Sequence, residues 1–132
     1  MSFFLDSDTC IDLLRGGSER SRASLLAKPP SEIAVPSIVE AELLFGALRS
    51  VAPKVELAKV RSFLGPLRVE PFGSAAAAHY AIVRADLEAL GAMIGANDLV
   101  VAATVLACGG TLVTGNTREF SRVAGLQLED WR

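Results

Sequence analysis

Residues 97–114 read NDLVVAATVLACGGTLVT, and this stretch indicates the fold class more clearly than any other. After two polar residues, the run 99–107 is apolar on every face of a helix, which predicts a largely buried helix. Gly109 and Gly110 are expected to end that helix as a C-cap pair, and 111–114 is predicted to be a strand. A buried helix that leads directly into a strand is typical of an α/β protein.

Short strands and helices alternate along the rest of the chain. Strands are predicted at 2–6, 32–36, 67–70 and 126–128, and helices at 10–14, 18–28, 38–48, 53–63 and 74–90, with a short turn or helix at 118–120. Asp8 or Thr9 is expected to cap the first helix, and Ser37 the helix at 38–48. This alternation predicts an α/β sandwich around a central, mostly parallel sheet of four or five short strands.

The composition excludes several classes of protein. The 132 residues suit one domain, and 51% of them are hydrophobic, so disorder is not expected. The longest uncharged apolar stretch, 99–113, is interrupted by glycines, whereas a membrane-spanning helix needs roughly 20 apolar residues. Asp6 and Asp8 argue against a signal peptide. Cys10 and Cys108 form no disulfide pattern, are expected to be buried, and fit a reducing cytoplasm.

The charge balance is nearly even, with 13 basic and 15 acidic residues. A net charge of −2 is not typical of a strongly electrostatic nucleic-acid binder, although a local basic patch remains compatible with it. Ten of the 13 basic residues are arginines, and the planar arginine side chain binds two phosphate oxygens at once.

Three acidic residues occupy unusual positions. Asp6 follows a strand of large apolar residues, Glu42 shares a helix face with apolar residues, and Asp98 begins the buried helix. Carboxylates drawn toward an apolar interior are costly unless they are paired or bind a metal ion, and basic residues are scarce in these segments. Oxygen ligands suit Mg²⁺ or Mn²⁺, and a water on such an ion could hydrolyse a phosphodiester bond.

Each of these acids also has an ordinary structural explanation. Asp6 could belong to a turn at the strand end, Asp98 could cap its helix, and Glu42 could face solvent. Their joint occurrence at predicted element ends favours a metal site. Other chemistries fit less well, because His79 is the only histidine and no G-x-S-x-G, P-loop or zinc-ligand pattern is present.

Four segments together resemble a known family. These segments are 4–9 (FLDSDT), 39–46 (VEAELLFG), 94–101 (IGANDLVV) and 112–123 (LVTGNTREFSRV). They resemble the PIN-domain family and, more narrowly, the VapC toxins of bacterial toxin–antitoxin systems, over nearly the whole chain. The resemblance implies a single PIN domain spanning residues 1–132, with a three-layer α/β/α sandwich.

The resemblance also implies an endoribonuclease that uses Mg²⁺ or Mn²⁺. Asp6, Glu42 and Asp98 match the metal-binding acids of the family. The fourth site position lies in the TGNTREF segment, where Asn116 and Glu119 are both candidates. In this mechanism one or two ions would bind the scissile phosphate, activate a water and stabilise the leaving oxygen.

Further residues are expected around that centre. Thr114 would orient a carboxylate or a water, and Arg15, Arg118 and Arg122 are the best candidates to contact RNA. Three positions depart from the family pattern, which commonly has Asn, His and Asn there; they are Asp8, Thr104 and Gly115.

The resemblance implies a homodimer and a cognate VapB-like antitoxin. The apolar residues 43–45 could supply one of these surfaces or simply pack in the core. Two other functions remain open: a PIN-like module that binds RNA or protein without catalysis, and a PIN nuclease outside toxin–antitoxin biology.

Overall fold

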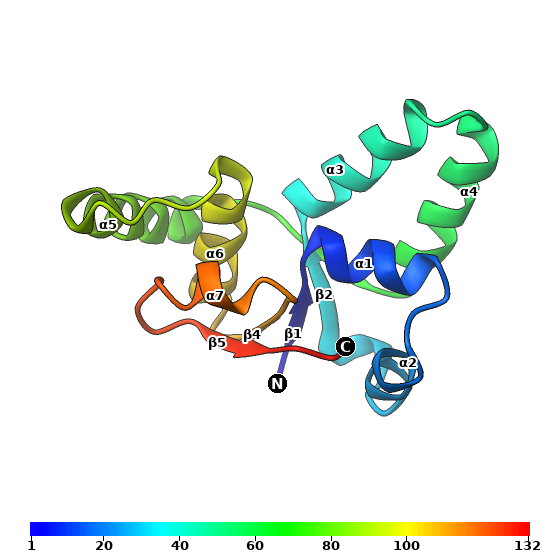
Figure 1. The fold of residues 1–132 in the computed structure, drawn as a ribbon, viewed down its shortest axis with the longest axis horizontal. Helices are drawn as coiled ribbons and strands as arrows, with labels where there is room; N and C mark the ends of the chain where they lie inside the picture. The colour runs from blue at the N-terminus through cyan, green and yellow to red at the C-terminus, as the bar shows by residue number, and fades with distance from the viewer.

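Five short strands form one parallel sheet at the centre of the computed structural model, which describes residues 1–132 (Figure 1). The strands are β1 (Phe3–Leu5), β2 (Ile33–Pro36), β3 (Arg68–Glu70), β4 (Thr111–Val113) and β5 (Gln127–Glu129). Their order is β3-β2-β1-β4-β5, and every neighbouring pair is parallel. The prediction of a mostly parallel sheet is confirmed, and all the carboxyl ends of the strands meet at one edge.

Seven helices pack around this sheet as an α/β/α sandwich. They are α1 (Ser7–Leu14), α2 (Glu19–Leu26), α3 (Ser37–Leu48), α4 (Pro53–Leu64), α5 (Ser74–Leu90), α6 (Ala96–Cys108) and α7 (Thr117–Phe120), with a 3-10 turn at Pro30–Glu32. In the view of Figure 1, α5 and α6 lie on one side of β1, and α1, α3 and α4 lie on the other. None of the helices is long and apolar enough to span a membrane.

Helix α6 is buried as its sequence predicts. Its buried side chains include Leu99, Val101 and Val105, and the Thr104 hydroxyl donates to the carbonyl of Val100 within the same helix. Gly109 ends the helix with a left-handed backbone at φ 69°. The next residue, Gly110, lies so close to Phe4 that a Cβ there would be 2.6 Å from the aromatic ring, so β4 enters the sheet in tight contact with β1.

The structure corrects two predicted helix caps. Asp6, and neither Asp8 nor Thr9, caps α1: its Oδ1 accepts a hydrogen bond of 2.9 Å from the backbone N–H of Thr9. Helix α1 therefore begins at Ser7. The N-cap of α3 is Pro36, while Ser37 is already helical and caps nothing, because β2 runs directly into this helix.

A third correction concerns the cysteines. Cys10 is fully buried, as expected, but Cys108 is exposed. Cys108 is the last residue of α6, and its thiol lies near Glu70 and Arg68 of the edge strand β3. Its apolar neighbours in the sequence therefore gave a misleading prediction of burial.

The two ends of the chain meet at β1. Trp131, which follows β5, is 3% exposed, and its ring centroid is 6.1 Å from that of Phe3. The Lys28 ammonium lies 4.7 Å from the Phe3 ring and 4.8 Å from the Trp131 ring, which adds a cation–π contact to both. The segment after β5 is thus fixed against the first strand.

Helices α3 and α4 form a hairpin that projects from the sheet (Figure 1). Leu43 packs into the core and Leu44 against it, but Phe45 is 61% exposed. Leu48, Val51 and Val55 are exposed on the same hairpin. Of the three residues 43–45, only Phe45 is therefore available as an interaction surface.

Candidate active site

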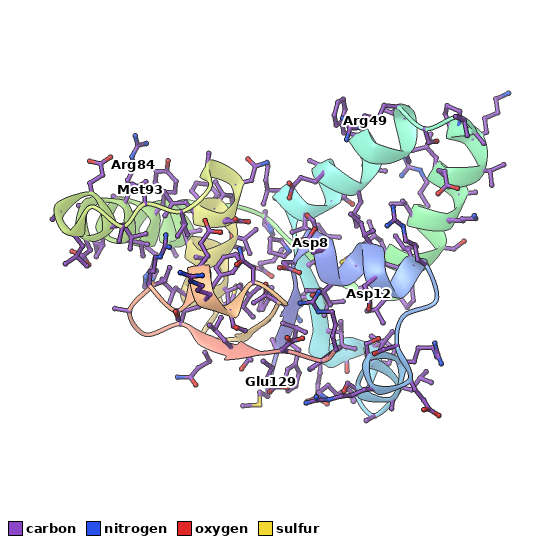
Figure 2. All side chains as sticks on the ribbon, viewed as in Figure 1. Asp8, Asp12, Arg49, Arg84, Met93 and Glu129 are labelled. Atoms are coloured by element: carbon purple, nitrogen blue, oxygen red, sulfur yellow. The ribbon has the colours of Figure 1, made fainter.

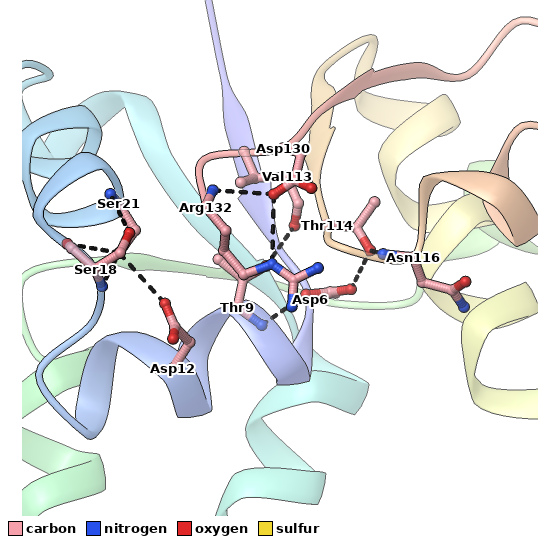
Figure 3. Close-up of polar contacts among 10 residues, drawn as sticks. All are labelled: Asp6, Thr9, Asp12, Ser18, Ser21, Val113, Thr114, Asn116, Asp130 and Arg132. Atoms are coloured by element: carbon pink, nitrogen blue, oxygen red, sulfur yellow. Dashed lines mark hydrogen bonds and ion pairs between the residues drawn. The ribbon is translucent and has the colours of Figure 1, made fainter.

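Asp6 lies at the carboxyl end of β1, where the parallel strands present their ends. Its side chain is only 6% exposed. One carboxylate oxygen caps α1 through Thr9, and the other accepts a hydrogen bond from the Thr114 hydroxyl at the end of β4 (Figure 3). Burial raises the pKa of Asp6, although the hydrogen bonds from Thr114 and Thr9 oppose this shift. The Thr114 hydroxyl thus holds one oxygen of the Asp6 carboxylate.

Glu42 reaches the same region from α3. Its Oε1 accepts a 2.6 Å hydrogen bond from the Ser7 hydroxyl, and its Oε2 accepts a 3.3 Å hydrogen bond from the amide of Asn97. Ser7 begins α1 and Asn97 lies in the first turn of α6. Glu42 thus connects the starts of two other helices and does not simply face solvent.

Asp98 completes the group as the third residue of α6. Gly95 is the N-cap of that helix, so Asp98 is not the cap. The Asp98 carboxylate folds back over the start of the helix, with Oδ2 3.1 Å from where a Cβ on Gly95 would lie. Its pKa is raised to about 6, first by burial and then by the nearby negative charges of four residues: Glu119, Asp6, Glu42 and Asp8. The negative charges of these four acids therefore all act on the Asp98 carboxyl at the start of α6.

The acidic cluster comprises Asp6, Asp8, Glu42, Asp98 and Glu119. None of the four ion pairs of the structure involves an acid of this cluster. Asp8 is exposed at the start of α1 (Figure 2). This departure from the family pattern adds negative charge to the site.

Asn116 and Glu119 are linked and form one unit. The amide of Asn116 donates a 2.7 Å hydrogen bond to Oε2 of Glu119, and the backbone N–H of Gly95 donates to Oε1 at 3.0 Å. These bonds, helped by Arg122, lower the pKa of Glu119, which therefore stays ionised. The loop after β4 is in this way fastened to the start of α6.

The three predicted RNA-binding arginines lie in different surroundings. Arg15 lines a surface cleft of about 740 Å³ that also contains Glu42. Arg122 donates to the carbonyl of Met93 and lies close enough to Glu119 to affect its pKa. The side chain of Arg118 is exposed and makes no hydrogen bond or ion pair within the chain.

Sequence reasoning missed Ser7 and Asn97 as partners of Glu42. Both are immediate neighbours of a predicted ligand, since Ser7 follows Asp6 and Asn97 precedes Asp98. Their position beside two acids of the cluster was the available signal. The pairing with Glu42 depends on how α3 crosses the sheet edge, which local sequence does not show.

The chemistry of the cluster fits a hard divalent cation. Its charged groups are all carboxylates, and Thr114, Asn116 and Asn97 supply only hydroxyl and amide groups, a set that suits Mg²⁺ or Mn²⁺. As the side chains stand, no three of the His, Cys, Asp and Glu residues converge closely enough to hold an ion. Glu42 is engaged by Ser7 and Asn97 instead.

The sequence and the fold now identify the family. The PIN domain matches residues 3–126, and the chain therefore belongs to the PIN-domain family. Nucleases of this family that are named VapC generally depend on a divalent metal ion.

Two curated relatives define the branch of the family more narrowly. The tRNA(fMet)-specific endonuclease VapC of Salmonella typhimurium is 35% identical over 131 residues, which is 99% of this chain and 98% of that protein. Ribonuclease VapC2 of Rickettsia felis is 36% identical over 133 residues, with the same coverage. The chain is thus a ribonuclease of the VapC type.

A solved structure agrees with this assignment. The DNA-bound VapBC complex of Salmonella typhimurium contains a chain that superposes with a TM-score of 0.95 at 35% identity, covering 100% of this chain and 99% of that one. The likeness therefore extends over the whole fold and includes the α3–α4 hairpin.

Proposed function

We propose that residues 1–132 act as one PIN domain that hydrolyses RNA in the bacterial cytoplasm, with Mg²⁺ or Mn²⁺ held by Asp6, Glu42 and Asp98. The observation that carries this proposal is that five acids from four segments gather around Asp98 and none of them forms an ion pair with a Lys or Arg. Such a concentration of negative charge is costly unless a cation offsets it.

In this proposal, the side chains around the site have different roles. A bound divalent ion would polarise the phosphate and lower the pKa of a water molecule. Thr9 and Thr114 hold the Asp6 carboxylate in one orientation. Ser7 and Asn97 hold Glu42 beside the cluster, where its carboxylate would be available to the ion. Asn116 holds Glu119, which would either join the ligands or orient water.

The experiment compares the purified protein on bulk bacterial tRNA and on messenger RNA, with Mg²⁺, with Mn²⁺ and with EDTA. Asp6→Asn and Asp98→Asn should each lower the cleavage rate by about 100-fold or more, because even residues that only support metal ligands contribute 10–100-fold. Asp86→Asn, an exposed acid on α5, is the matched control and should cleave normally. Full activity of either site variant, or in EDTA, would overturn the mechanism. RNA binding without cleavage would favour the non-catalytic module.

We further propose that the chain is the toxin of a VapBC-type pair and that the exposed apolar side chains of the α3–α4 hairpin contact the antitoxin or a second copy. Phe45 and Leu48 carry this assignment, because exposed large apolar groups on one hairpin mark an interaction surface. Induction of the chain alone should arrest growth, and co-expression of the adjacent small open reading frame should rescue it. The two products should elute together on size exclusion, and separate peaks would contradict the pairing.

A further inference from the structure

The structure draws attention to Arg132, which follows Trp131 after β5. Its guanidinium lies directly on the loop that joins β4 to α7. A Cβ built on Gly115 would overlap Nη2 and Cζ of Arg132, so the guanidinium occupies the space that a side chain at position 115 would take. Figure 3 shows the Arg132 side chain extending from Asp130 toward Asp6 and Thr114.

The loop beneath this guanidinium belongs to the acidic cluster. Thr114 donates to Asp6, and the backbone N–H of Asn116 donates to the Thr114 hydroxyl at 2.9 Å. Gly115 lies between these two residues. The positive charge of Arg132 is therefore at the rim of the candidate active site, although the residue is far from Asp6 in the sequence.

Most of the donors of Arg132 are free. Its Nε lies 3.5 Å from Oδ1 of Asp130, and this is the only ion pair that the side chain makes. Both Nη groups, which carry four N–H donors, have no partner in the chain. The side chain is 50% exposed, so these donors face solvent beside the cluster. A side chain that only filled the space over Gly115 would need no such charge.

We propose that Arg132 is a substrate-binding residue whose Nη groups donate to a phosphate oxygen of the RNA backbone on the Gly115 side of the site. This inference rests on the proposed function and adds a residue to it. Asp130 and the open Cα of Gly115 hold the guanidinium in place, so less side-chain freedom is lost when RNA binds. Glycine is then required at position 115, because any side chain there would displace the Arg132 guanidinium.

The test uses two variants that disturb the same contact differently. Arg132→Gln removes the charge, whereas Gly115→Ala keeps the charge but displaces the guanidinium. Gly115 has no left-handed backbone, so alanine introduces no backbone strain there. Arg20→Gln is the matched control, since Arg20 is exposed on α2 and makes no ion pair within the chain. Circular dichroism melts check that all variants fold.

Affinity is measured by fluorescence anisotropy with fluorescein-labelled bulk bacterial tRNA in EDTA, over a series of KCl concentrations. We expect Arg132→Gln to raise Kd by about tenfold and to lower the slope of log K against log [KCl] by about 0.7, the loss of one phosphate contact. Gly115→Ala should raise Kd similarly, and the double variant should match the single ones within about twofold. In cleavage assays with Mg²⁺, KM should rise while kcat stays within about twofold.

Each alternative outcome has a definite meaning. If Arg132→Gln binds tRNA no more weakly than Arg20→Gln, or if the effects of the two substitutions multiply in the double variant, the inference is wrong. If the wild-type protein binds tRNA but cleaves no RNA with any divalent ion, the proposed function fails while the Kd comparison still decides the role of Arg132. Absence of any tRNA binding by the wild-type protein would overturn the role of Arg132, while the cleavage assays on tRNA and messenger RNA decide the proposed function separately.

Discussion

At the scale of single residues, Asp6 has two structural tasks. One oxygen caps α1 through Thr9, and the other is held by Thr114. A loss of activity in Asp6→Ala would therefore mix the loss of a metal ligand with the loss of a helix cap, which alone costs about 1 kcal/mol. Asp6→Asn retains an oxygen that can cap the helix and is the cleaner test of catalysis.

Asp98→Asn should stabilise the metal-free protein near neutral pH. Because the pKa of Asp98 is raised to about 6 in the folded state, the wild-type protein loses stability as the pH rises from about 4 through 6, and the loss stays constant above that. After allowance for its partial exposure, we expect Asp98→Asn to be more stable by about 1–2 kcal/mol at pH 7.5, roughly 3–6 °C in Tm.

Differential scanning fluorimetry in EDTA between pH 4 and pH 8 measures this difference. The gap between wild type and Asp98→Asn should shrink toward pH 4, where the folded carboxyl is protonated and the unfolded one is about half protonated. A gap that is independent of pH would show that the substitution acts through packing and not through charge.

The positions of the acids could be predicted because each lies at the end of a recognisable element or interrupts an apolar one. The hydrogen bonds that orient these acidic side chains could not be predicted from the sequence. Asp6, Asp8 and Thr9 all have side chains that cap helices, and only the end of β1 decides that Asp6 does so. Likewise, the sequence offered Asn116 and Glu119 as alternatives, while the structure joins them through a hydrogen bond that α7 makes possible.

At the scale of secondary-structure elements, two glycines have opposite consequences for substitution. Gly110 leads into β4 against the Phe4 ring and the carbonyl of Ser2, so an added Cβ would be 2.6–2.9 Å from both. Gly46 lies within α3, where a Cβ would meet nothing within 4 Å. Glycine is required at position 110 because that residue is packed closely against β1. Packing does not require glycine at position 46, where it only weakens α3.

Gly110→Ala should destabilise the protein by about 1–3 kcal/mol, because the sheet must shift to relieve the overlap. Gly46→Ala should stabilise it by about 0.5–1 kcal/mol, since alanine favours the helix. Urea unfolding followed by circular dichroism measures both changes. Equal effects of the two substitutions would contradict the close approach of β4 to β1.

The element pattern was more predictable than the exposure of individual side chains. The five strands follow from short apolar runs between polar or glycine-rich segments. The burial of Cys10 and the exposure of Cys108 do not, because both have apolar neighbours in the sequence while Cys108 ends its helix beside charged residues of the edge strand β3. Phe45 is exposed for a related reason, since α3 extends past the sheet edge into the hairpin.

At the scale of the whole molecule, the acidic cluster is shared by segments that are distant in the sequence. The segment at the end of β1 and start of α1, the middle of α3, the start of α6 and the short helix α7 each supply part of it. A cation bound there would connect both sides of the sheet edge. Its binding energy would therefore appear as global stability.

Addition of Mg²⁺ at ten times its Kd should raise the stability of the wild-type protein at pH 7.5 by about 1.4 kcal/mol. NaCl at the same ionic strength is the control for simple screening of the repelling carboxylates. Thermal melts of wild type and of Asp98→Asn with each salt measure this change in stability. An equal rise in NaCl, or in Asp98→Asn, would contradict specific binding at the cluster.

The pairing of β5 with β4 and the packing of Trp131 on Phe3 set the order in which the site is completed during synthesis. The backbone N–H of Thr114 donates to the carbonyl of Glu129 in β5, and Trp131 covers the first strand. A nascent chain that has emerged from the ribosome only as far as α6 already carries Asp6, Glu42 and Asp98, but it lacks Thr114, which holds Asp6, and the Asn116–Glu119 pair. The acidic cluster therefore gains these last contacts only after β4 and α7 have left the ribosome, and β4 gains its outer neighbour only when β5 follows.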